Sequence, residues 1–220
     1  TVKAPIVTLT EYEIERIRDT IFTDEKLSIA RDWLVMSCYL GQRASDLLRM
    51  TQKMIVKEQG FRFIVLTQQK VGKLVQIPLH PEVEQILRKR NGQFPPVFSA
   101  NAGSNSAIYD RLLKDVGFRA NITAMTEGNL LDPKTKKYGT GMYPKWMLMS
   151  SHIGRRSFAT NFYAKREYPT PLLMSVTGHA TETMFLEYIG KKPSDYALQL
   201  AEMWSSRNTP SERLSNLRAV

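Results

Sequence analysis

The sequence predicts a mainly α-helical domain with a small antiparallel β-sheet, an α+β fold. Apolar residues recur at helical spacing over most of the chain, whereas residues 54–79 alternate between apolar and polar as strands do. The chain has 220 residues, 42% hydrophobic and 24% charged, which suits one domain with an ordinary core. We place this domain over residues 1–206 and expect a polar, flexible tail over residues 207–220.

Capping residues and apolar spacing define the helices. Thr10 and Glu13 have the spacing of a capping box and begin the first helix. The second helix covers residues 24–40 and ends at Gly41, and a short helix follows at 43–48. The remaining helices are expected at residues 81–89, 106–116, 152–165, 171–177, 181–188 and 194–205.

The alternating segment predicts a small antiparallel sheet. Gly72 lies in its turn, and Pro78 ends the second strand. The expected faces are Phe61, Phe63 and Val65 on one strand, and Val75 and Ile77 on the strand that faces it.

The chain is strongly basic. Lys and Arg number 31 against 21 Asp and Glu, a formal charge of +10. A polyanion neutralises such an excess best, so nucleic acid is the leading partner class. No segment has the ~20 consecutive apolar residues of a membrane span, and the N-terminus lacks the apolar run of a secretory signal. With Cys38 as the single cysteine, we expect a cytoplasmic, nucleoid-associated protein without disulfides.

Residues 126–147 are rich in Gly, Pro, Lys and Thr, show no clear period, and are expected to form a long loop. No acidic residue lies between Asp132 and Glu167, although basic residues are frequent there. A charge run is most simply a solvated face. The single sign of this one favours a surface that faces phosphate.

Five short motifs carry side chains suited to phosphate chemistry. In chain order they supply Arg43 after a helix end, Lys70 in the hairpin, His152 and Arg155 at helical i, i+3 spacing, His179 after a glycine, and Tyr188 nine residues later. Taken singly, each signal is weak. Arg43 alone would be a surface partner of Asp46, and Tyr188 alone a packing aromatic.

Taken in this order, the motifs resemble the catalytic domain of the tyrosine recombinase (phage integrase) family. The family shows Gly-x-Arg, a hairpin Lys, His-x-x-Arg, Gly-His and then a nucleophilic Tyr. The detailed motif sequences, with Gln-Lys-x-Gly-Lys followed by Ile-Pro-Leu, are most like those of integrases of bacterial mobile elements. The resemblance covers residues 10–188. It implies the fold of that catalytic domain, without the family's N-terminal DNA-binding domain, and an enzyme of site-specific DNA recombination and integration.

The resemblance also implies the chemistry. Tyr188 would attack a scissile phosphate, hold the strand as a 3′-phosphotyrosyl intermediate and release a 5′-hydroxyl. Arg43 and Arg155 would clamp the non-bridging oxygens, since a planar guanidinium fits phosphate and offsets the charge of the transition state. No metal or cofactor is then expected, because two arginines do the work of magnesium.

The resemblance assigns proton transfer to the lysine and the two histidines. Lys70 would protonate the leaving 5′ oxygen, although Lys73, three residues further on, is an alternative acid. His152 and His179 would hydrogen-bond the phosphate or help to move the Tyr188 proton. A free tyrosine has a pKa of about 10, so it needs nearby cations or a base to become a nucleophile at neutral pH.

Double-stranded DNA is the expected partner, with Lys73, Lys145 and Arg156 as further DNA contacts. The family resemblance implies four protomers around two duplexes, with a segment after the nucleophile given to a neighbour. Residues 194–206, rich in apolar side chains, would be that exchanged helix, with packing within one chain as the alternative.

Two rival functions share these motifs. A type IB topoisomerase uses a comparable set of Tyr, Arg and His to relax supercoils, and an accessory module could bind DNA through an inactive site. Metal binding has little support, because one Cys and three scattered His give no ligand spacing. A Ser-His-Asp hydrolase is disfavoured because no Gly-x-Ser-x-Gly elbow occurs.

Overall fold

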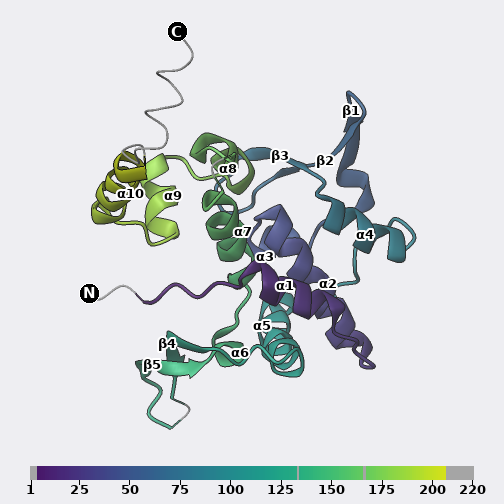
Figure 1. Cartoon of the computed structure of the whole chain (residues 1–220). Coiled ribbons are helices and arrows are strands. Elements are labelled where there is room, and N and C mark those ends of the chain that lie inside the picture. The colour runs from purple at the N-terminus through teal and green to yellow at the C-terminus, as the bar shows by residue number, and fades with distance from the viewer. Residues whose placement is uncertain (1–3, 133, 166, 207–220) are drawn as a thin grey trace.

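The computed structural model describes residues 4–132, 134–165 and 167–206 (Figure 1). The mainly helical architecture predicted from the sequence is confirmed, and the expected tail at 207–220 lies outside the described residues. Within the described part of the chain, no helix is both long enough and apolar enough for a membrane crossing. The helices are α1 (Glu11–Asp19), α2 (Glu25–Leu40), α3 (Ala44–Leu47), the 3₁₀ turn η1 (Gln52–Met54), α4 (Pro81–Lys89), α5 (Ala102–Arg119), α6 (Lys145–Leu148), α7 (Ile153–Tyr163), α8 (Thr170–Thr177), α9 (Glu182–Tyr188) and α10 (Pro193–Ser206).

Helix α2 is the central element of the core. Its consecutive residues Trp33, Leu34, Val35 and Met36 are all buried, so the helix is apolar on every side. Such a helix needs neighbours all round, and α2 packs against α1, α4, α5 and α7. It ends at Gly41, whose left-handed φ of +63° suits glycine. The end of α2 and the face of α7 thereby come into contact.

The predicted helix starts agree with the observed caps. Thr10 Oγ1 accepts from the Glu13 backbone N–H, and the Thr10 N–H donates to the Glu13 carboxylate, which completes the capping box. Helix α4 has the predicted bounds. Helix α5 is longer than the predicted 106–116, because Asn101 caps an additional polar turn that has no apolar spacing.

A three-stranded antiparallel sheet in the order β1-β2-β3 packs on one side of the helices. Its strands are β1 (Ile55–Glu58), β2 (Phe61–Thr67) and β3 (Leu74–Pro78). Ile64 pairs with Ile77 and Leu66 pairs with Val75, and all four are buried. The sequence assignment of faces was therefore wrong in one respect. The face with Phe61, Phe63 and Val65 is the outer one, opposite the side chains of Val75 and Ile77.

The prediction of a long loop at 126–147 is wrong, because this segment forms a second antiparallel hairpin. Strands β4 (Met125–Leu131) and β5 (Tyr138–Pro144) pair over their whole length and lead into α6. The hairpin extends from the end of the molecule opposite β1–β3 (Figure 1). Gly128 occupies an inward position where a Cβ would lie 2.5 Å from the Leu148 side chain. Such close packing requires glycine, and the glycines hide the alternation that would have indicated strands.

The C-terminal helices lie together beside α7 (Figure 1). Helix α8 ends at Gly178, which has a left-handed φ of +77°. The connection to α9 therefore turns back sharply toward α7, and α9 ends at Tyr188. The helix predicted at 194–205 is present as α10.

Candidate active site

Arg155 is the centre of the cluster that the sequence predicted. Its side chain is buried, and its Nη1 donates to the Gly41 carbonyl oxygen at 2.7 Å. Its Nη2 lies 3.5 Å from His179 Nε2, and its Cζ lies 5.6 Å from the centroid of the Tyr188 ring. Burial, with some repulsion from Arg43, lowers the pKa of Arg155 to about 10. The guanidinium therefore remains a cation at neutral pH.

Close packing of two helices places Arg155. A Cβ on Gly154 would lie 1.4 Å from Ser37 Oγ, so only glycine lets α7 approach α2 this closely. One turn further on, the Phe158 ring fills the space beside Gly41, where a Cβ would lie 2.6 Å from the ring. Both contacts bring the end of α2, and with it the carbonyl that binds Arg155, against α7.

His179 lies between α7 and α9 and is only 8% exposed. Its Nδ1 is 2.9 Å from Thr177 Oγ1, and its ring centroid lies 5.0 Å from that of Tyr188. Burial lowers the pKa of His179 to about 4, and the charges of Arg155, Arg43 and Lys73 add to the effect. The imidazole is therefore neutral near pH 7.

Tyr188 presents an unusual buried hydroxyl. Its oxygen is shielded from solvent and has no hydrogen-bond partner of good geometry among the described residues. Burial raises the pKa of Tyr188, while the charges of Arg155, Arg156 and Arg43 act in the opposite direction. A buried polar atom without a partner is costly. The charges of three arginines thus act on a hydroxyl that burial alone would keep protonated.

Arg43 reaches the cluster from the N-terminus of α3, where it is the N-cap residue. Its Nη1 lies 3.4 Å from Gln68 Oε1. Gln68 Nε2 donates to Gln42 Oε1 at 2.7 Å and to the Thr177 carbonyl at 3.1 Å, and Gln42 Nε2 donates to the Val176 carbonyl at 2.7 Å. Two fully buried amides thus join the start of α3, the β2–β3 hairpin and the end of α8.

The sequence interpretation missed Gln42, the middle residue of its Gly-x-Arg motif, and Gln68, which directly precedes its Gln-Lys-x-Gly-Lys motif. Glutamine is usually exposed, so nothing in the sequence marked these two as buried. The carboxylate of Asp46 accepts from Arg49 and from the Gln69 backbone N–H, which holds the hairpin beside Lys70.

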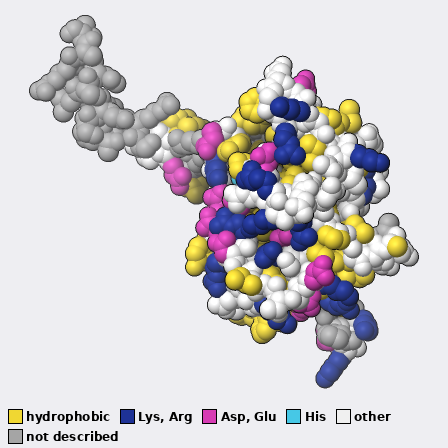
Figure 2. Space-filling model, turned by 90° about the vertical axis from the view of Figure 1, so that its right-hand side faces the viewer, with side chains coloured by type: hydrophobic (Ala, Val, Ile, Leu, Met, Phe, Trp, Pro, Cys, Tyr) yellow, Lys and Arg dark blue, Asp and Glu magenta, His cyan; other side chains and the backbone are white. Residues whose placement is uncertain are grey.

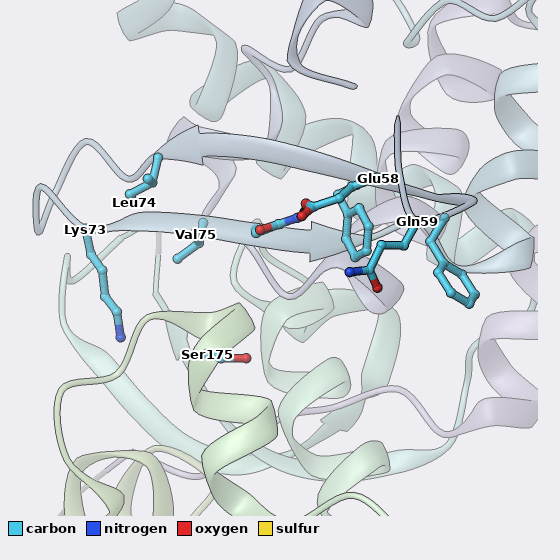
Figure 3. A pocket seen from close by; sticks show the side chains of 9 residues that line it. Glu58, Gln59, Lys73, Leu74, Val75 and Ser175 are labelled. Atoms are coloured by element: carbon cyan, nitrogen blue, oxygen red, sulfur yellow. Dashed lines mark hydrogen bonds between the residues drawn. The ribbon is translucent and has the colours of Figure 1, made fainter. Parts of the chain in front are cut away.

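The two candidate lysines border the cluster on different sides. Lys70 is exposed on the β2–β3 hairpin, and its charge is among those that lower the pKa of His152, after burial and Arg156. Lys73 points away from the strands toward the helix that carries Ser175 (Figure 3), and its charge is among those that lower the pKa of His179. Both lysines therefore lie within electrostatic range of one histidine of the predicted set.

His152 is the N-cap residue of α7 and is partly exposed. It lies three residues before Arg155, as the i, i+3 spacing predicted. No hydrogen bond of its side chain is found among the described residues. The ring can therefore hydrogen-bond to a group bound at the edge of the cluster.

The three residues expected to contact DNA differ in their surroundings. Arg156 is half-buried, and its Nε lacks a hydrogen-bond partner among the described residues. Lys145 is only 9% exposed, and its Nζ binds Glu13 Oε2 at 2.7 Å. This internal ion pair gives the Lys145 ammonium a carboxylate partner within the protein, unlike an exposed lysine that faces solvent. The exposed Lys73 has no such partner among the described residues.

A cleft of about 600 Å³ lies on the outer face of the sheet, and of the predicted site residues only Lys73 lines it. Glu58 and Gln59 line one end, while Lys73 and Ser175 line the end near α8 (Figure 3). Lys and Arg side chains also cross the middle of the face shown in Figure 2, with acidic side chains beside them. In the part of the chain that the structure describes, no three His, Cys, Asp or Glu side chains are grouped to hold a metal ion.

Comparisons with known proteins place the fold. No protein-family model matches the chain, and no curated protein matches it. Among solved structures, XerA recombinase superposes with a TM-score of 0.59 at 17% identity, over 95% of this chain and 67% of that one. The Tn1549 transposon integrase in complex with circular intermediate DNA gives 0.58 at 23% identity, over 90% and 65%. The XerH site-specific recombinase bound to difH substrate gives 0.57 at 18% identity, over 93% and 56%.

The chain has the tyrosine recombinase catalytic-domain fold. It spans little more than half the length of the XerH chain. Within this tyrosine recombinase fold, Arg43, Arg155, His179 and Tyr188 converge on one cluster, and His152 and Lys70 lie at its edge. Residues from four separate parts of the sequence thus meet in one cluster.

Proposed function

We propose that this protein is a site-specific tyrosine recombinase, an integrase that cleaves and rejoins DNA strands through a 3′-phosphotyrosyl intermediate. One observation carries the proposal. The hydroxyl of Tyr188, which has no hydrogen-bond acceptor of good geometry among the described residues, is buried beside the cation of Arg155 and the neutral imidazole of His179. A nucleophile, a cation for phosphate and a proton carrier are the groups that phosphoryl transfer to tyrosine requires.

In the proposed reaction, Arg43 and Arg155 bind the non-bridging oxygens of the scissile phosphate. Arg155 is held by the Gly41 carbonyl and Arg43 by Gln68, so both guanidinium groups are oriented before DNA arrives. Pre-oriented donors cost little reorganisation when negative charge builds up in the transition state. The Tyr188 oxygen attacks phosphorus, the bond to the 5′ oxygen breaks, and the phosphotyrosyl bond preserves the energy for rejoining.

The leaving 5′ oxygen needs a proton, which we assign to Lys70. Lys70 lies on the hairpin next to Gln68 and Gln69, which are tied to the cluster and to Asp46. A substrate with sulfur in place of the bridging 5′ oxygen tests the assignment, because a thiolate leaves without a proton. The sulfur substrate should restore cleavage to Lys70→Ala but not to Tyr188→Phe. If it restores Lys73→Ala instead, Lys73 is the acid.

Double-stranded DNA is the proposed substrate. The chain is strongly basic, the XerH structure holds a difH substrate, and the Tn1549 integrase structure holds circular intermediate DNA. Arg156 and Lys73 are proposed as backbone contacts because each carries charge near the cluster. Affinity that depends on such contacts falls steeply with salt. Replacing one contacting residue should lower the slope of log affinity against log salt by about 1.

We also propose that recombination proceeds in a homotetramer assembled through α10. The helix exposes Leu198, Leu200 and Trp204, the last being 61% exposed, although large apolar side chains are normally covered. Removal of residues 193–220 should abolish assembly on DNA while leaving the fold of residues 4–192 intact. Unchanged assembly of the shortened chain would indicate that α10 packs on its own protomer.

The main test is covalent trapping on DNA. The full chain and its Tyr188→Phe variant are incubated with a pool of nicked duplexes of randomised sequence. The short fragment that carries the new 5′-hydroxyl is lost at the nick, which prevents rejoining. The proposal predicts a denaturant-resistant complex with the unaltered chain and none with the variant. Binding without any covalent complex would favour an accessory DNA-binding module. A topoisomerase would be favoured if the chain forms the covalent complex and relaxes supercoiled plasmid DNA but never exchanges strands between two duplexes.

A further inference from the structure

We propose that Thr177 is a positioning residue that holds His179 in the Nδ1–H tautomer and so makes Nε2 the acceptor of the Tyr188 proton. This inference rests on the proposed function and extends it to the direction of one proton transfer. It concerns a residue that lies two positions before His179, at the end of α8.

The hydrogen bonds of Thr177 determine which nitrogen carries the proton. The Thr177 hydroxyl donates to the Leu173 carbonyl at 2.9 Å. The same oxygen lies 2.9 Å from His179 Nδ1. A hydroxyl has one hydrogen to donate and two lone pairs. With its hydrogen directed at Leu173, Thr177 Oγ1 accepts a hydrogen bond, so Nδ1 carries the proton.

The contact of the second ring nitrogen, Nε2, independently selects the same tautomer. His179 Nε2 lies 3.5 Å from Arg155 Nη2. An arginine guanidinium has donors only. A proton on Nε2 would set two donors against each other in a buried site, whereas a lone pair on Nε2 faces the cation favourably. Both neighbours of the ring therefore select the Nδ1–H form.

This tautomer decides what His179 offers to the reaction. Nε2 carries a lone pair on the side of the ring that faces Arg155, and the Tyr188 ring packs at 5.0 Å. The Tyr188 hydroxyl has no hydrogen-bond partner of good geometry among the described residues, so it has a proton to give and no competing acceptor there. Neutral His179 with its Nδ1–H therefore acts as an acceptor and not as a donor to phosphate at the start of the step.

The proposed step balances as follows. The phenol proton of Tyr188 passes to His179 Nε2, which gives an imidazolium with both nitrogens protonated. The tyrosine oxygen forms the bond to phosphorus while the bond to the 5′ oxygen breaks, and that oxygen takes its proton from Lys70. A bound phosphate offsets the positive charges of Arg155 and Arg43, which otherwise oppose protonation of His179. Rejoining reverses each transfer.

Nitrogen NMR of the histidine side chains in the free protein tests the tautomer without any reaction. The His179 signal is assigned by its loss in His179→Gln. The unaltered chain should show Nδ1 protonated and Nε2 unprotonated near pH 7. Thr177→Val keeps the side-chain shape but removes the acceptor, so it should shift the tautomer ratio, and Thr177→Ser should restore it. An Nε2–H tautomer in the unaltered chain, or an unchanged ratio in Thr177→Val, would overturn the proposal.

The consequence for reaction is tested by single-turnover formation of the covalent complex. Thr177→Val should slow it on the order of 10-fold or more, the usual cost of removing a partner that orients a functional histidine, while Thr177→Ser stays near the unaltered rate. Equal rates for all three proteins would overturn the role in proton transfer. If the unaltered chain forms no covalent complex, the proposed function fails together with this role, while the NMR result still decides whether Thr177 sets the tautomer.

Discussion

The guanidinium of Arg155 lies over the ring of Tyr188, with its Cζ 5.6 Å from the ring centroid. The same guanidinium donates to the Gly41 carbonyl. One side chain therefore links the end of α2 to the proposed nucleophile. Its position accounts for the partial offset of the raised Tyr188 pKa, because a nearby cation stabilises the phenolate.

Arg155→Lys should lower the rate of covalent complex formation by about 10²-fold or more. A lysine retains the charge but not the planar fork that binds a carbonyl and a phosphate together. Arg88→Lys, at a residue 69% exposed in its side chain, is the matched control and should react at the unaltered rate. If both variants react equally fast, Arg155 does not bind the phosphate.

Gln68→Leu should lower the free energy of unfolding by about 1–3 kcal/mol, because it leaves the buried Gln42 amide oxygen without its donor. Gln69→Leu offers a matched control, since the neighbouring side chain is exposed, and should change stability by less than about 0.5 kcal/mol. Urea denaturation of the two variants measures the difference. Equal stabilities would show that the amide pair contributes little.

Gly154→Ala should destabilise the protein by about 1–3 kcal/mol, because the new methyl group would overlap Ser37 and push α7 away from α2. The shift would also displace Arg155. Combining it with Ser37→Ala removes the closest atom and should recover part of the loss. Thermal unfolding of the two single variants and the double variant checks this coupling, and strictly additive effects would argue against the contact.

Stability should fall as the pH drops from about 6.5, the ordinary pKa of histidine, toward 4. The folded pKa of His179 is about 4. Between these values the unfolded chain binds a proton at His179 that the folded chain does not, so protons favour unfolding. His179→Gln should therefore show a shallower pH dependence, by up to about one proton. The carboxylates contribute equally to the pH dependence of the unaltered chain and of His179→Gln. Identical slopes of stability against pH in the two proteins would contradict the lowered pKa of His179.

Much of the fold could be predicted because its signals are local. The capping box at Thr10, the left-handed Gly41 and the apolar spacing of α2 are properties of neighbouring residues. The β4–β5 hairpin escaped prediction because glycines interrupt its alternation, among them the inward Gly128, which packs under Leu148. The alternation of inward and outward residues in this hairpin becomes visible only when the packing of Gly128 against Leu148 of α6 is known.

The cluster was predictable as a set of residues but not as a network. The order of the motifs identified Arg43, Arg155, His179 and Tyr188, which do come together. The partners that orient them, Gln42, Gln68 and Thr177, come from three separate parts of the chain and carry no local mark of burial. The same limit explains Lys145, whose partner Glu13 lies 132 residues away in sequence.

The most direct measurement is the identity of the residue that carries DNA in the trapped complex. The covalent complex is digested with nuclease and trypsin, and the nucleotide-bearing peptide is sequenced by mass spectrometry. Trypsin leaves residues 167–191 as one peptide with two tyrosines, Tyr168 and Tyr188. We predict the nucleotide on Tyr188, with Tyr168→Phe forming the complex normally. A nucleotide on Tyr168 or on any other residue, or a complex that persists in Tyr188→Phe, would contradict the proposed function.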